Sequence, residues 1–187
     1  MKPNYLMMKR LGFIIVILLT SIFSSPAQKT LHDFKATTLE GEPFDFAQLK
    51  GKKVLIVNTA SKCSFTPQYK ELEKLYTTYT NKNFIIIGFP SNDFGKQEPG
   101  TAKEIREFCT VNFGITFPLM EKVHVKGKEI HPIYQWLTNK QENGKEDVPV
   151  IWNFQKFMIN EEGHWIDFLP PGKNPDSPKL IQWIEGQ

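Results

Sequence analysis

Two short apolar runs mark the centre of the predicted fold. Residues 54–57 (VLIV) and 84–89 (FIIIGF) contain no charged side chain, which is typical of strands buried on both faces of a parallel sheet. The segment between them predicts a helix over residues 70–79, with Thr66 as its cap and Pro67 in its first turn. Its apolar face is set by spacings of three and four, at Tyr69, Leu72, Leu75, Tyr76 and Tyr79. Strand, helix and strand in this order predict a right-handed βαβ unit.

The remaining pattern predicts one α/β domain with a mixed sheet. Turn residues between apolar stretches predict one hairpin over 34–46 and an antiparallel hairpin from the strands 151–160 and 163–169. Further helices are expected at 101–113, where Thr101 caps the first turn, and at 131–137 and 179–185. Residues 117–120 and 123–125 are expected to be short and extended, and residues 138–148 to form a polar loop.

The first 27 residues differ in composition from the rest. Lys9 and Arg10 precede the uncharged run 11–23, and Ser25 and Ala27 place small residues at the −3 and −1 positions of a cut after Ala27. This arrangement predicts a secretory signal peptide at 1–27 and a domain at 28–187. We therefore expect export to the periplasm or the extracellular space. An uncleaved N-terminal membrane anchor is the alternative, although thirteen residues are short for a span.

The predicted signal peptide also accounts for the net charge. It carries three basic residues and no acidic ones, so the formal charge of +3 leaves the following domain neutral. Basicity therefore gives no reason to expect nucleic acid as a partner. The four histidines show no ligand spacing, and neither a metal nor another cofactor is expected.

Cys63 is the candidate reactive group. It follows the first buried strand and precedes the helix, and the N–H groups at a helix N-terminus favour a thiolate over a thiol. The alternative is a small buried hydrophobic residue, but the polar sequence around it, including Lys62, favours the reactive thiol. Cys109 is the only other cysteine. In an exported protein the two could also form a structural disulfide.

Three blocks of sequence together resemble the glutathione peroxidase family. They are residues 58–69 around Cys63, residues 88–100 ending in Gln-Glu-Pro-Gly, and Trp152-Asn153-Phe154 before Lys156-Phe157. The resemblance runs from about residue 32 to the last helix and implies a thioredoxin-like fold, with a central mixed sheet flanked by helices. It also implies a peroxidase that reduces hydrogen peroxide and organic or lipid hydroperoxides.

The family's catalytic tetrad falls residue by residue on Cys63, Gln97, Trp152 and Asn153. A thiolate attacks one peroxide oxygen, and uncharged amide and indole N–H donors can stabilise first the thiolate and then the departing oxyanion. Taken singly, Trp152 could be a core residue and the two amides turn residues. Asp93 stands where relatives commonly have Gln, and its charge could oppose thiolate formation.

Cys109 lies where some family members carry a resolving thiol. The resemblance then implies an intramolecular disulfide with Cys63, recycled by a thioredoxin-like dithiol rather than by glutathione. The segment between Leu137 and Trp152 is short, as it is in monomeric relatives, and this resemblance implies a monomer. Two other readings stay open: a thiol–disulfide oxidoreductase or redox relay, which the lack of a CxxC motif disfavours, and a binding domain with an inert Cys63–Cys109 bridge. A disulfide needs Cα atoms within about 7 Å, and we expect the reduced form to hold the two cysteines farther apart. Formation of the disulfide should therefore require the helix over 101–113 to unwind partly.

Overall fold

A computed structural model describes residues 28–186, so the predicted signal peptide lies outside the described residues. The strands are β1 (Lys35–Thr37), β2 (Pro43–Asp45), β3 (Lys53–Thr59), β4 (Phe84–Pro90), β5 (Lys156–Ile159) and β6 (Trp165–Leu169). The α-helices are α1 (Gln68–Tyr79), α2 (Ala102–Phe113), α3 (Pro132–Thr138), α4 (Lys140–Asn143) and α5 (Pro178–Glu185). Short 3₁₀ turns at Leu31–Asp33, Phe46–Leu49 and Thr80–Lys82 complete the elements.

The predicted mixed sheet is confirmed. Its strand order is β4-β3-β5-β6, with β3 parallel to β4 and antiparallel to β5, while β5 and β6 form the antiparallel hairpin. The predicted first hairpin is the separate β1–β2 pair. Every residue of β4, and every residue of β3 after Lys53, is buried, as the two uncharged runs predict.

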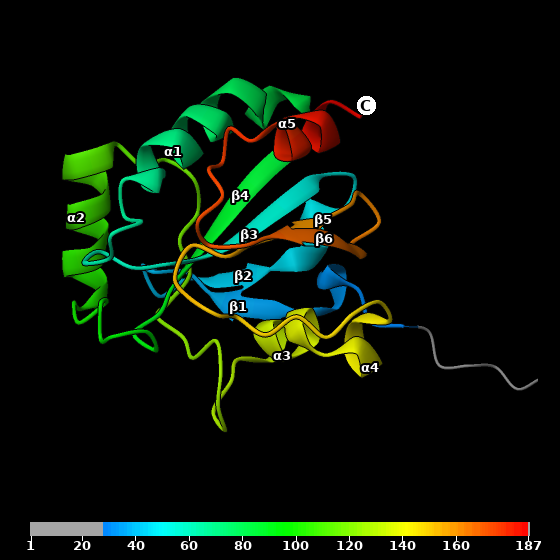
Figure 1. The fold of residues 1–187 in the computed structure, drawn as a ribbon, viewed down its shortest axis with the longest axis horizontal. Coiled ribbons are helices and arrows are strands. Elements are labelled where there is room, and N and C mark those ends of the chain that lie inside the picture. The colour runs from blue at the N-terminus through cyan, green and yellow to red at the C-terminus, as the bar shows by residue number, and fades with distance from the viewer. Residues whose placement is uncertain (1–27, 187) are drawn as a thin grey trace, which may run out of the picture.

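Helices cover one face of the sheet, and helix α3 together with the β1–β2 hairpin covers the other (Figure 1). On one face, Leu55 and Val57 pack with apolar residues of α1, α2 and α5. On the other, Val54 and Ile56 pack with α3 and with residues around the β1–β2 hairpin. This alternation along β3 follows from the two-residue period of a strand. Among residues 28–186, no helix has the length and apolar content needed to cross a membrane.

Helix α2 stands at the end of the sheet where β3 and β4 terminate (Figure 1). Thr101 and Glu104 form a capping box at its start, and Gly114 closes it in the left-handed conformation with a φ of 62°. Ile105 and Cys109 are its only buried residues. The predicted helix and its Thr101 cap are therefore confirmed.

Two predictions of local secondary structure are wrong. The strand expected over 151–160 covers only 156–159, because Trp152 and Gln155 bond to the side chain of Asn58, near the end of β3, instead of continuing the β-ladder with that strand. The loop expected over 138–148 contains α4, whose start is capped by the Asn139 side chain. The stretches 117–120 and 123–125, expected to be short and extended, belong to none of the named strands; Leu119 and Met120 each form one isolated bridge, to Gly88 and Thr38.

Candidate active site

Cys63 lies in a tight turn between β3 and α1, and Thr66 braces that turn. The Cys63 amide donates to the Thr66 hydroxyl at 3.0 Å, and this hydroxyl donates to the Ala60 carbonyl at 2.8 Å. Thr66 is therefore not the helix cap predicted from the sequence; Pro67 occupies that position, with no capping side chain. The Phe65 amide donates to Cys63 Sγ at 3.4 Å, so a backbone donor faces the sulfur. Cys63 is 7% exposed.

The Gln97–Glu98 segment supports the Cys63 turn from the side. The Lys62 amide donates to the Gln97 carbonyl at 3.0 Å, and the Ser61 hydroxyl donates to Glu98 Oε2 at 3.1 Å. Gly95 and Lys96 both have positive φ, 59° and 53°, which turns the chain back so that Gln97 reaches this position. The loop after β4 is thus tied directly to the residues preceding Cys63.

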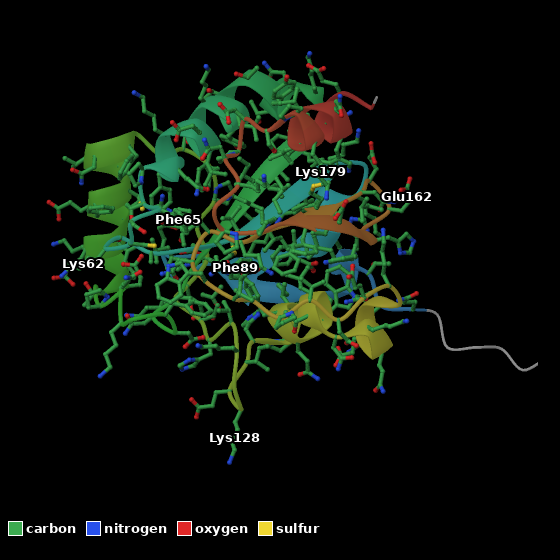
Figure 2. The ribbon with its side chains drawn as sticks, in the orientation of Figure 1. Lys62, Phe65, Phe89, Lys128, Glu162 and Lys179 are labelled. Carbon is green, nitrogen blue, oxygen red and sulfur yellow. The ribbon has the colours of Figure 1, made fainter. Side chains whose placement is uncertain are left out.

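Glu98 is a buried carboxyl that the sequence analysis did not single out. It is 1% exposed, and burial raises its pKa to about 7, against the opposing effects of the Ser61 hydrogen bond, Lys122 and Lys62. Its Oε1 has no hydrogen-bond partner among residues 28–186. A pocket of about 300 Å³ lies between the Cys63 turn and α2; its lining residues are Ser61, Lys62, Glu98, Pro99, Gly100, Glu104, Ile105 and Phe108. Figure 2 shows Lys62 and Phe65 at the end of the molecule that α2 occupies.

Two of the predicted site residues bond directly to each other. Asn153 Nδ2 donates to Gln97 Oε1 at 2.9 Å, across 56 positions of sequence. Asn153 is fully buried, and Phe154 after it has a φ of 68°, which bends the chain sharply toward β5. With its carbonyl oxygen engaged, the side chain of Gln97 has a fixed orientation and an NH₂ group free to donate elsewhere.

Asn58, at the end of β3, positions the turn that carries Trp152 and Asn153. Its Nδ2 donates to the Trp152 carbonyl at 3.0 Å, and its Oδ1 accepts from the Gln155 amide at 3.1 Å. The Phe154 amide donates to the Asn58 carbonyl at 2.6 Å. Asn58 belongs to the first sequence block, but no role was predicted for it. An amide side chain ending an otherwise apolar strand is the signal that could have identified it.

Trp152 lies at the rim of the site. It is 37% exposed, and its ring centroid lies 5.5 Å from that of Phe94, a buried residue of the loop after β4. Ile151 beside it is 61% exposed. Within residues 28–186, the hydrogen bond that Cys63 Sγ accepts comes from the Phe65 amide, and the donation predicted from Gln97, Trp152 and Asn153 stays a prediction.

Cys109 lies on the buried face of α2, in the same apolar cluster as Cys63, and both thiols are free. Burial raises the pKa of the Cys109 thiol to about 11, against the opposing effect of the Tyr69 hydroxyl. Cys109 is therefore protonated at neutral pH in this conformation and is shielded from solvent. To attack a partner it must first become accessible.

Asp93, whose charge could oppose thiolate formation at Cys63, is engaged elsewhere. Its Oδ1 lies 2.6 Å from His124 Nδ1, and its Oδ2 accepts from the Val125 amide at 2.7 Å. In the part of the chain that the structure describes, no three His, Cys, Asp or Glu side chains are grouped so as to hold a metal ion.

Lys156 is a second buried charged group outside the predicted site. Its Nζ donates to Gln68 Oε1, to the Lys173 carbonyl at 2.6 Å and to the Pro171 carbonyl at 3.2 Å. All three acceptors are uncharged, and burial lowers the pKa of Lys156 to about 7. The lysine joins β5 to the first turn of α1 and to the loop over residues 170–174.

Comparison with known proteins agrees with this architecture. The sequence profile described as glutathione peroxidase matches residues 31–138. The glutathione peroxidase-like peroxiredoxin gpx1 of Schizosaccharomyces pombe is 50% identical over 137 residues, which cover 73% of this chain and 85% of the relative. The hydroperoxy fatty acid reductase gpx1 of Synechocystis is 43% identical over 147 residues, or 75% and 86% of the two chains.

Solved structures extend the comparison to the fold. The crystal structure of Trgpx in its apo form superposes with a TM-score of 0.66 at 37% identity, and covers 84% of this chain and 96% of its own. A thioredoxin-family thiol:disulfide interchange protein of Chlorobium tepidum shares only the fold, with a TM-score of 0.59 at 17% identity over 86% and 99% of the two chains. The thioredoxin-like α/β fold is therefore confirmed, and the chain belongs to the glutathione peroxidase family.

Proposed function

We propose that the protein is an exported thiol peroxidase that reduces hydrogen peroxide and organic or lipid hydroperoxides. The observation that carries the proposal is the placement of Cys63 in a turn that is bonded to the same segment as the Gln97–Asn153 pair. The exposed apolar side chains of Ile151 and Trp152 suit substrates with an apolar chain. The name of the Synechocystis relative, a hydroperoxy fatty acid reductase, supports the same substrate class.

The first step oxidises Cys63. Its thiolate attacks one oxygen of the hydroperoxide, the S–O bond forms, the O–O bond breaks, and the alkoxide leaves as an alcohol after taking up a proton. Sulfur loses two electrons and becomes a sulfenic acid. The N–H donors of Gln97, Trp152 and Asn153 stabilise the negative charge on sulfur and then on the leaving oxygen, a contribution of about 3 kcal/mol for one well-placed donor.

The second step joins the two cysteines. The Cys109 sulfur attacks the sulfenic sulfur, an S–S bond forms, the S–O bond breaks, and water leaves. A thioredoxin-like dithiol, or glutathione, then reduces the disulfide and returns both thiols. The name peroxiredoxin in the Schizosaccharomyces pombe relative supports thiol-dependent recycling. The enzyme acts as a monomer without a metal or another cofactor.

Stopped-flow measurement of peroxide consumption tests the assignment of the two cysteines. Cys63→Ser is expected to abolish the first turnover. Cys109→Ser should retain one turnover but lose recycling by a dithiol. A full first turnover in Cys63→Ser would refute the role of Cys63, and unchanged recycling in Cys109→Ser would refute the role of Cys109.

A redox titration distinguishes the enzyme from a domain with an inert bridge. An inert Cys63–Cys109 disulfide should have a potential below about −300 mV and resist reduction by thioredoxin and glutathione. A recycling disulfide should be reduced by at least one of them.

Export is tested separately by N-terminal sequencing of the secreted or periplasmic protein, which should begin at Gln28.

A further inference from the structure

Two segments meet beside Trp152 and are fastened to each other by a carboxylate. The first is the turn after β4, with Asp93 and Phe94. The second is the loop from Val123 to His131, whose tip carries Lys128 and projects from the molecule in Figure 2. The loop has no regular secondary structure of its own. Its position must therefore come from contacts with the turn.

Asp93 supplies the most direct of these contacts. Its two oxygens have different partners, His124 Nδ1 at 2.6 Å and the Val125 amide at 2.7 Å, and its side chain is only 9% exposed. A carboxylate that accepts two short hydrogen bonds in a shielded position fixes both partners more firmly than an exposed ion pair does.

Other contacts hold the loop in the same place. The Val123 amide donates to the Pro90 carbonyl at 3.0 Å, and the His131 amide closes the loop by donating to the His124 carbonyl at 2.8 Å. Glu129 Oε2 lies 3.6 Å from His124 Nε2, on the side of the imidazole away from Asp93. His124 is thus held between two carboxylates, of which Asp93 is the less exposed one.

The consequence reaches the site through Phe94. Phe94 is 4% exposed, and its ring contacts both Lys126 of the loop, whose Nζ is 4.2 Å from the ring centroid, and Trp152, whose ring centroid is 5.5 Å away. Phe94 is therefore the surface against which the indole of Trp152 rests. Asp93 precedes Phe94 in the chain and binds the amide of Val125, which precedes Lys126.

We propose that Asp93 is a positioning residue for Trp152. By binding His124 and the Val125 amide it fixes the position of Phe94, whose ring contacts the indole of Trp152 and orients it at the peroxidase site. The proposal rests on the proposed function, in which the Trp152 N–H assists the chemistry at Cys63. It also gives the charge of Asp93 a structural use in place of an effect on the thiolate.

The kinetic test is a double-mutant cycle on the rate of Cys63 oxidation. Asp93→Ala is expected to lower this rate about tenfold, since small displacements of a catalytic group are costly. Asp93→Asn keeps an oxygen acceptor for the Val125 amide and should stay within about threefold of the wild type. In a Trp152→Phe background, Asp93→Ala should cost less than about threefold, because the group that it positions is already gone. Full additivity of the two substitutions would overturn the proposal.

A spectroscopic test is independent of the enzymatic activity. In ¹⁵N-labelled protein, the indole N–H signal of Trp152 is identified by its loss in Trp152→Phe. Asp93→Ala should shift this signal, Asp93→Asn should shift it much less, and the signals of Trp136, Trp165 and Trp183 should stay in place, which shows that the fold is intact. An unmoved Trp152 signal in Asp93→Ala would refute the positioning role. If the wild type fails to react with peroxide, the proposed function fails, while the spectra still decide whether Asp93 orients Trp152.

Discussion

The side-chain amide of Asn153 donates a 2.9 Å hydrogen bond to the side-chain carbonyl of Gln97. This bond joins the loop after β4 to the turn before β5. It engages the side-chain carbonyl of Gln97 and leaves the NH₂ group of that amide to donate elsewhere. The rotamer of Gln97 is therefore set by a residue that is distant in sequence.

Replacement of Asn153 tests this relationship. Asn153→Ala removes one donor and releases Gln97, so the rate of Cys63 oxidation should fall by about 10²-fold or more. Asn153→Asp should also be slow, because a carboxylate cannot donate to Gln97 Oε1 and repels the thiolate. Stopped-flow kinetics gives the rates, and Asn174→Ala, at an exposed position, is the matched control. A rate within twofold of the wild type in Asn153→Ala would contradict the assignment.

Helix α2 is expected to open when the enzyme is oxidised. Cys109 is fully buried on its inner face in the reduced structure, while only Ile105 and Cys109 of the helix are buried, so partial unwinding loses few apolar contacts. Hydrogen exchange should show lower protection for amides 104–112 in the disulfide form than in the reduced form.

Helix α1 serves as the internal reference for that exchange experiment, because it should keep its protection in both forms.

The ion pair from Arg106 to Glu40, at 2.6 Å, fastens α2 to the β1–β2 connection. Arg106→Gln should therefore make the disulfide form a few times faster, in keeping with the small energy of a partly exposed pair. Equal protection of α2 in both redox states would eliminate the opening model.

Glu98 should make stability depend on pH. Because burial raises its folded-state pKa from 4.5 to about 7, the folded protein binds a proton between these values that the unfolded chain has lost. The contribution of Glu98 to the free energy of unfolding therefore falls as pH rises from 4.5 to 7, by up to about 3 kcal/mol. Glu98→Gln should remove this loss, so its stability relative to the wild type should increase over this range.

Urea unfolding of the reduced wild type and Glu98→Gln, at several pH values between 4.5 and 7.5, measures this difference. Glu107→Gln, at an exposed position on α2, is the control for the loss of one negative charge. A stability difference between Glu98→Gln and the wild type that does not change with pH would show that Glu98 is ionised throughout.

Lys156 should make the free energy of unfolding change with pH in the opposite direction, and at higher pH. Burial lowers its folded-state pKa from 10.5 to about 7, so above pH 7 the unfolded chain keeps a proton that the folded protein has lost. The free energy of unfolding should then rise by about 1–2 kcal/mol between pH 7 and 8.5. Above that range, deprotonation of Cys109 in the unfolded chain would begin to oppose the rise, because burial raises the folded-state pKa of that thiol.

Lys156→Met should remove this rise while lowering stability overall, since it removes the donor to Gln68 Oε1 and to the Lys173 carbonyl, whereas the Pro171 carbonyl still accepts from Gln68 Nε2. Lys70→Met, at an exposed position of α1, is the comparison variant in the same unfolding experiment. A rise with pH that persists in Lys156→Met would assign it to another group.

The sequence by itself determined the elements whose signals are local. The uncharged runs of β3 and β4, the apolar spacing of α1 and the Thr101 cap of α2 each depend on a few neighbouring residues, and the structure confirms all of them. The three sequence blocks likewise sufficed to identify the glutathione peroxidase family. Local signals misled where a side chain had a distant or unexpected partner. Thr66 looks like a helix cap, but its hydroxyl bonds to Cys63 and Ala60.

Only the tertiary structure decided how the blocks are joined. Residues 151–155 have a strand-like composition, yet Asn58 takes up the backbone groups of Trp152 and Gln155 and bends the segment into a turn. The Gln97–Asn153 bond, the burial of Glu98 and Lys156, and the contact of Asp93 with His124 also join residues that no periodic pattern relates. Hydrogen bonds and desolvation depend on distances in space, which a one-dimensional pattern of polar and apolar residues does not contain.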